Sequence, residues 1–439
     1  MNAPADSSDA IGAAALRKAS WRLLPLLFLG YGFAYIDRLN IGFAALQMNE
    51  QLHFSATIYG LGGGLFFLSY ALCEVPSNLL LLRFGARRWL ARIMISWGLI
   101  SVGMLFVRTP MEFYVMRFLL GAAEAGFFPG VVYYLTQWFP ASYRGRAISR
   151  FYVAYAVSAA VMGALAGPLL GLDGHLGLAG WQWLFLVEGA PAVLLGAVIL
   201  MCLPDTPAEA RWLTEAERAW IESRRAAETV GVAGDPGFAR ALFDQRVWLL
   251  GLCNVCILGA SYAFNLSAPT VLKEVTNWSA GQVGLLISGA ALFGALLMVV
   301  NGAHSDSRRE RYLHTVVPLI VVAVAILGIG LSMTTSLVAP AFVLYSGGTA
   351  AVQATFWLIP CDSLRGRSAA SGLAAIGCIG MLGAFIGPLA WGLAKDHTGS
   401  YQLGLVSISI TYAIAVLLLL LIRRWARSAE AAIPAGAVA

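Results

Sequence analysis

Long apolar stretches recur along the whole chain, and they limit what it can fold into more than any other feature. Each covers about 20 residues or more, the length a helix needs to cross roughly 30 Å of hydrocarbon. Twelve can be delimited, near residues 21–46, 56–82, 88–107, 111–138, 146–170, 181–203, 246–270, 280–303, 312–333, 336–359, 368–393 and 401–422. The pattern predicts an all-α integral membrane protein with twelve transmembrane helices.

The composition excludes the main soluble classes. Of 439 residues, 59% are hydrophobic and only 12% are charged, which is too little polar surface for a water-soluble globule and too much apolar mass for a disordered chain. The six cysteines lie within or at the ends of the apolar stretches, so no disulfide framework is expected. Cys253 and Cys256 form a CxxC without a second ligand pair, and we predict neither a metal site nor a cofactor.

The basic residues indicate how the spans are oriented. If both termini are cytoplasmic, the 29 Lys and Arg residues fall almost entirely in inner segments, and only Arg108, Lys273 and Lys395 fall in outer loops. Short basic loops stay on the cytoplasmic side of a membrane. We therefore predict that both ends are cytoplasmic, and we attribute the net charge of +6 to orientation and not to nucleic-acid binding.

The spans divide into two groups of six. The longest polar break follows the sixth span, and in it Thr214 and Glu217 form a capping-box pattern before a short helix-favouring run. Residues 1–20 show no cleavage pattern and are expected to be retained. The sequence predicts five parts: a cytoplasmic tail (1–20), a six-helix bundle (21–203), a cytoplasmic linker with a short interfacial helix (204–245), a second six-helix bundle (246–426) and a cytoplasmic tail (427–439).

The two groups of six also repeat each other. Arg144-Gly145-Arg146 is followed after an apolar span by Gly167-Pro168, and residues 365–367, again Arg-Gly-Arg, are followed in the same way by Gly-Pro at 387–388. Pseudo-symmetric halves of this kind, with a substrate site between them near the bilayer midplane, are typical of secondary transporters. The repeat therefore favours a two-halved carrier.

Charged side chains inside the first six spans are the main functional signal. A charge in mid-bilayer costs at least about 2.5–3.5 kcal/mol on insertion scales, so such groups must face a cavity or one another. The helical rise places Arg38 in the first span and Arg117 in the fourth at a similar depth below the outer surface. The full set is Asp37, Arg38, Glu74, Arg117, Glu124 and, nearer a span end, Glu188.

Two guanidinium groups at one depth repel each other unless an anion lies with them. A substrate carboxylate would supply that anion, because guanidinium can donate to both of its oxygens. Arg38 and Arg117 are therefore predicted to bind an organic carboxylate. The alternative is that both arginines pair with Asp37, Glu74 or Glu124 and only hold helices together.

Neighbouring residues refine this hypothesis. Tyr35 and Arg38 share one helical face, whereas Asp37 is rotated from it by about 100°. An apolar surrounding favours the neutral form of a carboxyl group, so Asp37 and Glu124 are candidates to carry protons. The five histidines map to loops or span ends. The last six spans hold no charged residue in their interiors, so any contribution from them is uncharged, with Trp357 among the candidates.

Several motifs resemble one known family. Residues 117–130 (RFLLGAAEAGFFPG), followed by 138–140 (WFP) and 144–146 (RGR), are similar to the fourth-span motif of the anion:cation symporter branch of the major facilitator superfamily. Residues 35–40 (YIDRLN) resemble the first-span motif of that branch. The resemblance covers essentially the whole chain and implies two pseudo-symmetric six-helix bundles.

The resemblance also implies a function. The family takes up organic anions such as sugar acids, tartrate, phthalate and other aromatic carboxylates, usually with protons, and a bacterial-type inner membrane would be its location. We expect a monomer. Carried over to the matching positions, Arg38 and Arg117 would hold the carboxylate, Asp37 and Glu124 would carry protons, and Tyr35 and Tyr70 would line the site.

The chain departs from the family pattern at three places. Leu82 replaces an Asp usual in the loop after the second span, the eleventh-span run at 376–381 (IGCIGM) lacks two Asn residues, and Tyr155 stands where similar sugar-acid carriers have Gln. The last two departures remove amide partners for substrate hydroxyl groups. An aromatic carboxylate is therefore predicted over a sugar acid or tartrate, with Tyr155 and Trp357 completing the site.

The sequence thus predicts a proton-coupled importer of an organic carboxylate that works by alternating access. An exchanger or exporter of the same fold is one alternative. An integral-membrane enzyme using the buried acids is another, although the chain shows no nucleophile–base pair or cofactor motif. A sensor would be expected to carry an added soluble domain. The roles of Glu74 and Glu188 stay open.

Overall fold

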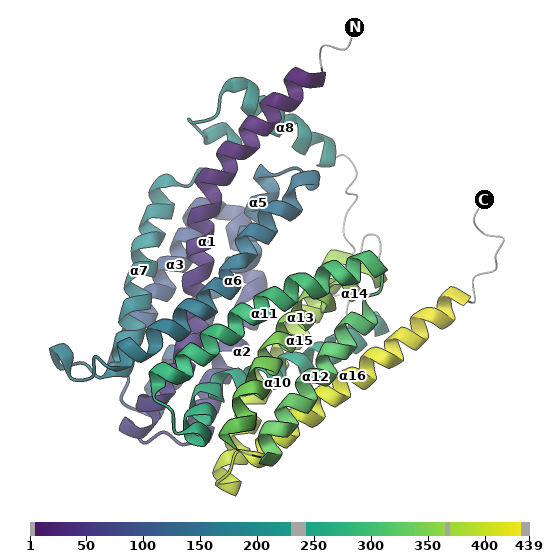
Figure 1. Cartoon of the computed structure of the whole chain (residues 1–439). Helices are drawn as coiled ribbons and strands as arrows, with labels where there is room; N and C mark the ends of the chain where they lie inside the picture. The colour runs from purple at the N-terminus through teal and green to yellow at the C-terminus, as the bar shows by residue number, and fades with distance from the viewer. Residues whose placement is uncertain (1–4, 230–242, 333, 365–368, 432–439) are drawn as a thin grey trace. The chain divides into compact units, whose positions relative to one another are not determined.

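The computed structural model describes residues 5–229, 243–332, 334–364 and 369–431 (Figure 1). Over these residues every regular element is a helix. The helices are α1 (Ala5–Gln51), α2 (Ala56–Phe84), α3 (Ala86–Gly103), α4 (Pro110–Glu124), α5 (Phe127–Trp138), α6 (Ala141–Leu170), α7 (Gly180–Cys202), α8 (Glu215–Thr229), α10 (Gln245–Thr276), α11 (Ala280–Arg308), α12 (Tyr312–Ser332), α13 (Thr335–Phe356), α14 (Leu358–Ser363), α15 (Ala369–Thr398) and α16 (Gln402–Ala431).

The described helices agree with the predicted apolar spans. Eleven helical segments are long and apolar enough to cross a bilayer. The first predicted span, residues 21–46, lies within α1, where Arg22, Asp37 and Arg38 lower the hydropathy below that of the other eleven. The prediction of an all-α membrane protein is therefore confirmed. The Arg-Gly-Arg repeat at 365–367 lies outside the described residues.

Two compact units make up the described chain. Unit 1 contains residues 5–40, 69–161 and 172–229, and unit 2 contains residues 41–68, 162–171 and the described residues from 243 onward. The last turns of α1, the first half of α2 and the end of α6 thus pack with the later helices. All the charged residues predicted inside spans lie in unit 1.

The fourth predicted span, residues 111–138, is not one continuous helix. It ends as α4 at Glu124 and resumes as α5 at Phe127. The break is at Gly126, whose φ of 86° is left-handed, and a Cβ there would lie 2.4 Å from Ser77 Oγ. Only glycine fits both the backbone angle and the space, and the break leaves Glu124 at the exact end of a helix inside unit 1.

The tenth predicted span, residues 336–359, is also divided into two helices, but without a left-handed residue between them. It consists of α13, which ends at Phe356, and α14, which begins at Leu358, with Trp357 between them. Trp357 keeps right-handed helical angles (φ −67°, ψ −18°), and Pro360, which has no N–H to donate to the Phe356 carbonyl oxygen, interrupts the helical hydrogen bonds there. Trp357 therefore lies at a helix junction in unit 2.

Helices α3 and α7 approach each other closely in unit 1. A Cβ on Gly98 would lie 2.7 Å from the Gly189 carbonyl oxygen, and a Cβ on Gly189 would lie equally close to that of Gly98. Small residues allow helix backbones to come together within a membrane. The contact fixes Ser101, one turn after Gly98, and Glu188, next to Gly189, on the same part of the interface.

The segment after α7 folds back on the start of α1. Helix α8 begins with a capping box, in which Thr214 N donates to Glu217 Oε2 (2.9 Å) and Glu217 N donates to Thr214 Oγ1 (3.3 Å). Lys18 of α1 donates from Nζ to Glu217 Oε2 at 2.8 Å. The residues predicted as a tail are therefore helical from Ala5 and are fastened to α8 within unit 1.

In unit 2, the start of α2 is held by later helices. Asp396 of α15 accepts hydrogen bonds from the backbone N–H groups of Ala56 (3.0 Å) and Thr57 (2.8 Å). Tyr59 donates from its hydroxyl to the Leu266 carbonyl oxygen of α10 at 2.8 Å. A carboxylate at a helix N-terminus satisfies N–H groups that have no partner inside the helix.

Candidate functional site

Arg38 and Glu124 form a buried ion pair in unit 1. Arg38, on α1, donates to Glu124 Oε1 from Nε (2.9 Å) and from Nη2 (2.6 Å). Glu124 is 1% exposed, and the side chain of Arg38 is 13% exposed. A predicted substrate-binding residue and a predicted proton carrier are thus in direct contact. This is also the kind of pairing expected by the alternative in which the arginines only hold helices together.

The guanidinium of Arg38 also lies over an aromatic ring. Tyr70 of α2 presents its ring 5.0 Å from Arg38 Cζ, and Tyr70 is buried. Glu74, one turn further along α2, is partly buried and interacts electrostatically with Arg38. Glu124 Oε2 finds no hydrogen-bond donor among the described residues. Arg38 therefore lies between a carboxylate and the face of a ring.

Asp37 points to a different neighbour than Arg38 does. Ser101 of α3 donates to Asp37 Oδ1 at 2.6 Å, and both residues are buried. Arg117, on α4 and 1% exposed, interacts electrostatically with both Asp37 and Glu124. The two arginines and two acids therefore form one buried charged cluster contributed by α1 and α4.

A group of aromatic rings lines unit 1 beside Arg38. The rings of Tyr35 on α1 and Tyr155 on α6 lie 4.3 Å apart, and Tyr155 is stacked on Tyr152 at 5.8 Å with an angle of 8°. Tyr31, one turn before Tyr35, contacts Phe151 at 4.9 Å. The structure thus brings Tyr155, the position that departs from the sugar-acid pattern, next to Tyr35.

Two partners of this cluster, Asn40 and Ser101, were not found from the sequence. Asn40, buried on α1, donates from Nδ2 to Glu188 Oε2 on α7, and Ser101 contacts Asp37 as described. Asn40 follows Asp37 by three residues, so the two share a helical face. That spacing could have indicated Asn40, but nothing in the sequence specified α3 and α7 as its neighbours.

Trp357 is the one predicted site residue that belongs to unit 2. It is partly buried at the junction of α13 and α14, and its ring meets that of Phe356 edge to face at 5.6 Å. Tyr35, Tyr70 and Tyr155 all lie in unit 1 with the charged cluster.

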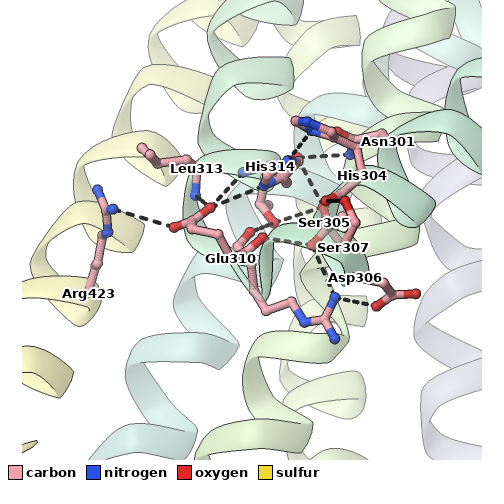
Figure 2. Close-up of polar contacts among 12 residues, drawn as sticks. Asn301, His304, Ser305, Asp306, Ser307, Glu310, Leu313, His314 and Arg423 are labelled. Atoms are coloured by element: carbon pink, nitrogen blue, oxygen red, sulfur yellow. Dashed lines mark hydrogen bonds and ion pairs between the residues drawn. The ribbon is translucent and has the colours of Figure 1, made fainter.

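A second polar cluster lies in unit 2 where α11 ends and α12 begins (Figure 2). His304 Nδ1 is 2.7 Å from His314 Nε2, and His314 Nδ1 is 3.2 Å from Glu310 Oε2. Glu310 Oε2 also accepts from the backbone N–H of Leu313 at 2.7 Å and so caps α12, while Glu310 Oε1 lies 3.4 Å from Arg423 of α16. This cluster fastens helix ends.

The CxxC pair is buried in α10. Cys253 is fully buried and Cys256 is 8% exposed, and Cys253 Sγ donates to the Ala415 carbonyl oxygen at 3.7 Å. Within the described parts of the chain, no three metal-ligating side chains come together. Both cysteines therefore pack against neighbouring helices.

Comparison with known proteins relates the geometry to a family. Residues 27–388 match the Major Facilitator Superfamily. A protein of Agrobacterium vitis with the provisional name tartrate transporter is 40% identical to this chain over 413 residues. These residues cover 94% of this chain and 92% of that protein. A protein of Acinetobacter baumannii named quinolone resistance transporter is 38% identical over 410 residues, covering 92% and 93%.

Solved structures show a related fold. A bacterial homologue of the human lysosomal transporter Spinster, crystallised in an inward-facing and unoccupied conformation, has a TM-score of 0.76 to this chain. The likeness covers 92% of this chain and 97% of that one, at 18% sequence identity. This likeness concerns the arrangement of helices alone.

Proposed function

Because this chain belongs to the major facilitator superfamily and is a secondary transporter, we propose that it imports an organic carboxylate together with protons. Its family and the names of its relatives make it a transporter and not an enzyme. The observation that carries the proposal is the buried contact between Arg38 and Glu124. In the proposal, Arg38 and Arg117 bind the anion, and Asp37 and Glu124 exchange protons.

The Arg38–Glu124 contact supports a coupling between anion and proton. Arg38 presents its donors to Glu124 Oε1, the same kind of oxygen that a substrate carboxylate would offer. The two carboxylates therefore compete for one guanidinium. A proton on Glu124 removes its charge, weakens its hold on Arg38 and strengthens the binding of the anion. By linkage, bound anion must raise the proton affinity of Glu124 equally.

Arg117 and Asp37 support the same coupling between anion binding and protonation. Arg117 interacts with both buried acids, so an anion that binds near it lowers the net positive charge available to Asp37 and Glu124. Both acids then favour protonation in a low-dielectric surrounding. We therefore propose that the loaded site carries more protons than the empty one, which is the condition for a proton symporter.

The tyrosines support an aromatic substrate. Tyr35 and Tyr155 present adjoining rings beside Arg38's helix, and an aromatic acid could add a further ring contact of about 0.5–1.5 kcal/mol. A Tyr at 155 also removes an amide that could bind a hydroxyl. The relatives' names include both tartrate and quinolones, so the preference rests on these rings.

The proposed cycle is alternating access between two halves. The halves would be residues 21–203 and 246–426, joined by the linker 204–245, with Trp357 supplying an uncharged contact from the second half. Breaks in membrane helices next to substrate groups, such as the break after Glu124, are common in secondary transporters. We further propose a monomer in a bacterial inner membrane with both termini cytoplasmic, supported by the distribution of Lys and Arg.

An exporter or exchanger of the same fold is the second candidate. The relative named quinolone resistance transporter favours it, because resistance is commonly achieved by removing a compound from the cell. The same buried cluster would serve, with protons moving in the opposite direction to the substrate.

Uptake into proteoliposomes distinguishes these possibilities. Radiolabelled aromatic acid, tartrate and sugar acid should each be offered with and without an imposed inward proton gradient. The proposal expects accumulation of the aromatic acid only with the gradient, and none with Arg117→Lys. Leu99→Ala, at an exposed position on α3, is the matched control and should transport normally. Uptake that does not depend on the proton gradient contradicts proton symport. Accumulation only when the imposed proton gradient is directed outward contradicts it as well.

A further inference from the structure

Glu188 is a buried acid that the proposed transport cycle does not use. It lies on α7 and is 5% exposed, and Asn40 of α1, which is fully buried, donates to its Oε2. Asn40 also interacts with the carboxyl group of Asp37, one turn before it. Asn40 therefore interacts with two carboxyl groups, and Ser101 donates to Asp37 Oδ1.

Three buried oxygen atoms at and beside Asn40 lack a hydrogen-bond donor. Glu188 Oε1, Asn40 Oδ1 and Asp37 Oδ2 are all buried, and none has a donor among the described residues. An ionised carboxylate can only accept, so two ionised acids leave the amide oxygen unsatisfied. One proton on Glu188 Oε1 can be donated to Asn40 Oδ1 and closes a two-bond acid–amide pair. If the oxygen and nitrogen of the Asn40 amide are exchanged, a proton on Glu188 is still needed, because the amide oxygen would then face Glu188 Oε2.

The groups around the two acids also favour a charge on Asp37 over a charge on Glu188. Asp37 interacts favourably with Arg117, Arg38 and the hydroxyl of Ser101. The charged group that acts on Glu188 is Asp37, which has the same sign, and its favourable partner is the neutral Asn40. Two adjacent carboxylates in a dry interior do not both ionise. The negative charge therefore belongs on Asp37 and the proton on Glu188.

We propose that Glu188 holds a proton shared with Asn40, and that this neutral pair is a positioning element for the charged site. It fixes the turn of α1 that carries Asp37 and Arg38 against α7 without adding a charge. The protons that move with substrate are then exchanged at Asp37 and Glu124 and not at Glu188. That last statement rests on the proposed function, whereas the protonation of Glu188 does not.

Infrared difference spectroscopy tests the protonation without any transport. The full chain and Glu188→Gln are compared in detergent, without substrate, at neutral and mildly alkaline pH. The expected difference is a protonated-carboxyl C=O band that Glu188→Gln lacks and that shifts in frequency in Asn40→Ala, because its hydrogen bond is lost. A difference confined to the ionised-carboxylate bands overturns the proposal. Gln preserves the shape and both hydrogen bonds of the neutral acid, so this variant is expected to fold.

The pH profile of uptake tests the positioning role. Glu188→Gln should keep the profile of the unmodified chain. Asn40→Asp replaces the amide with another acid, so a further proton is needed. Uptake at neutral pH should therefore fall by about tenfold and recover at acidic pH. A tenfold fall corresponds to a shift of about one pKa unit in the pH profile. The double variant Asn40→Asp/Glu188→Gln recreates an inverted acid–amide pair and should restore the neutral-pH rate.

Two results overturn the positioning role. One is loss of gradient-driven accumulation in Glu188→Gln, which would make Glu188 a coupling residue. The other is an Asn40→Asp defect that the double variant does not relieve. If the unmodified chain shows no proton-dependent uptake, the proposed function fails, and the infrared band still decides the state of Glu188.

Discussion

Replacing Glu124 with Gln separates binding of the anion from its coupling to protons. The substitution keeps a carbonyl oxygen that can accept from Arg38, but it removes the negative charge that lies 2.6 Å from Nη2. Arg38 then depends on the Tyr70 ring, 5.0 Å away, and on its electrostatic interactions with Asp37 and Glu74. A buried charge left wholly unpaired costs about 3–5 kcal/mol, and these remaining partners reduce the expected loss of stability to about 1–3 kcal/mol.

The effect on substrate is opposite in sign. Without a competing carboxylate, Arg38 is available to the anion, and the affinity at neutral pH should rise by about tenfold, or about 1.4 kcal/mol. The affinity should also lose most of its pH dependence. Exchange of labelled for unlabelled substrate at equal concentrations should persist, whereas accumulation driven by a proton gradient should disappear.

The assay compares gradient-driven uptake, equilibrium exchange and binding in one set of proteoliposomes. Leu99→Ala serves as the control for expression and insertion, since Leu99 is exposed. The Glu124→Gln variant has no carboxyl group at residue 124 to exchange a proton. Accumulation by this variant at the level of the unmodified chain would therefore refute the reasoning. Weakened binding that still varies with pH would equally contradict competition for Arg38.

Three further changes have defined outcomes. Tyr155→Gln restores an amide beside Tyr35, so competition assays should show a shift of about tenfold from aromatic acid toward sugar acid, the value of one hydrogen bond of about 1–1.5 kcal/mol. Burial acts to raise the pKa of Glu217, but hydrogen bonds from Lys18 and Thr214 outweigh burial and lower this pKa. Glu217→Gln should therefore reduce the Tm fully only above the pKa that Glu217 has in the unfolded chain. The difference in Tm between the variant and the unmodified chain should vanish as the pH falls through the lower pKa of the folded state. Asn301→Ala removes hydrogen bonds to the carbonyl oxygens of His314 (2.9 Å; Figure 2) and Ala351 (3.1 Å), and should lower the free energy of unfolding by about 1–2 kcal/mol in denaturant titrations.

The sequence predicts positions along a helix better than partners across helices. Apolar length gave the spans, and the 100° rotation between Asp37 and Arg38 correctly separated their neighbours, Ser101 and Glu124. Which acid faces Arg38 depends on how α1 packs against α4, and no periodicity records that packing. The sequence therefore indicates the Arg38–Glu124 pair only as one of several contacts that these charges can make.

The breaks in the fourth and tenth spans show the same limit. Gly126 was visible in the sequence, but a glycine inside an apolar helix more often serves close packing than a left-handed turn. At Trp357 the local signal is Pro360, which has no N–H to donate to the Phe356 carbonyl oxygen, and a proline inside an apolar span more often kinks a helix than divides it. Asn40 is visible in the first-span motif, but its pairing with Glu188 depends on how α1 packs against α7, which no periodicity records.

Proton uptake on substrate binding tests the central claim most directly. The purified chain in detergent is titrated with the carboxylate in a calorimeter, at neutral pH, in buffers of different ionisation enthalpy, so that the protons exchanged follow from the slope. Competition between the anion and Glu124 for Arg38 predicts net proton uptake that is lost in Glu124→Gln. Binding with no proton uptake, or with proton release, would contradict it.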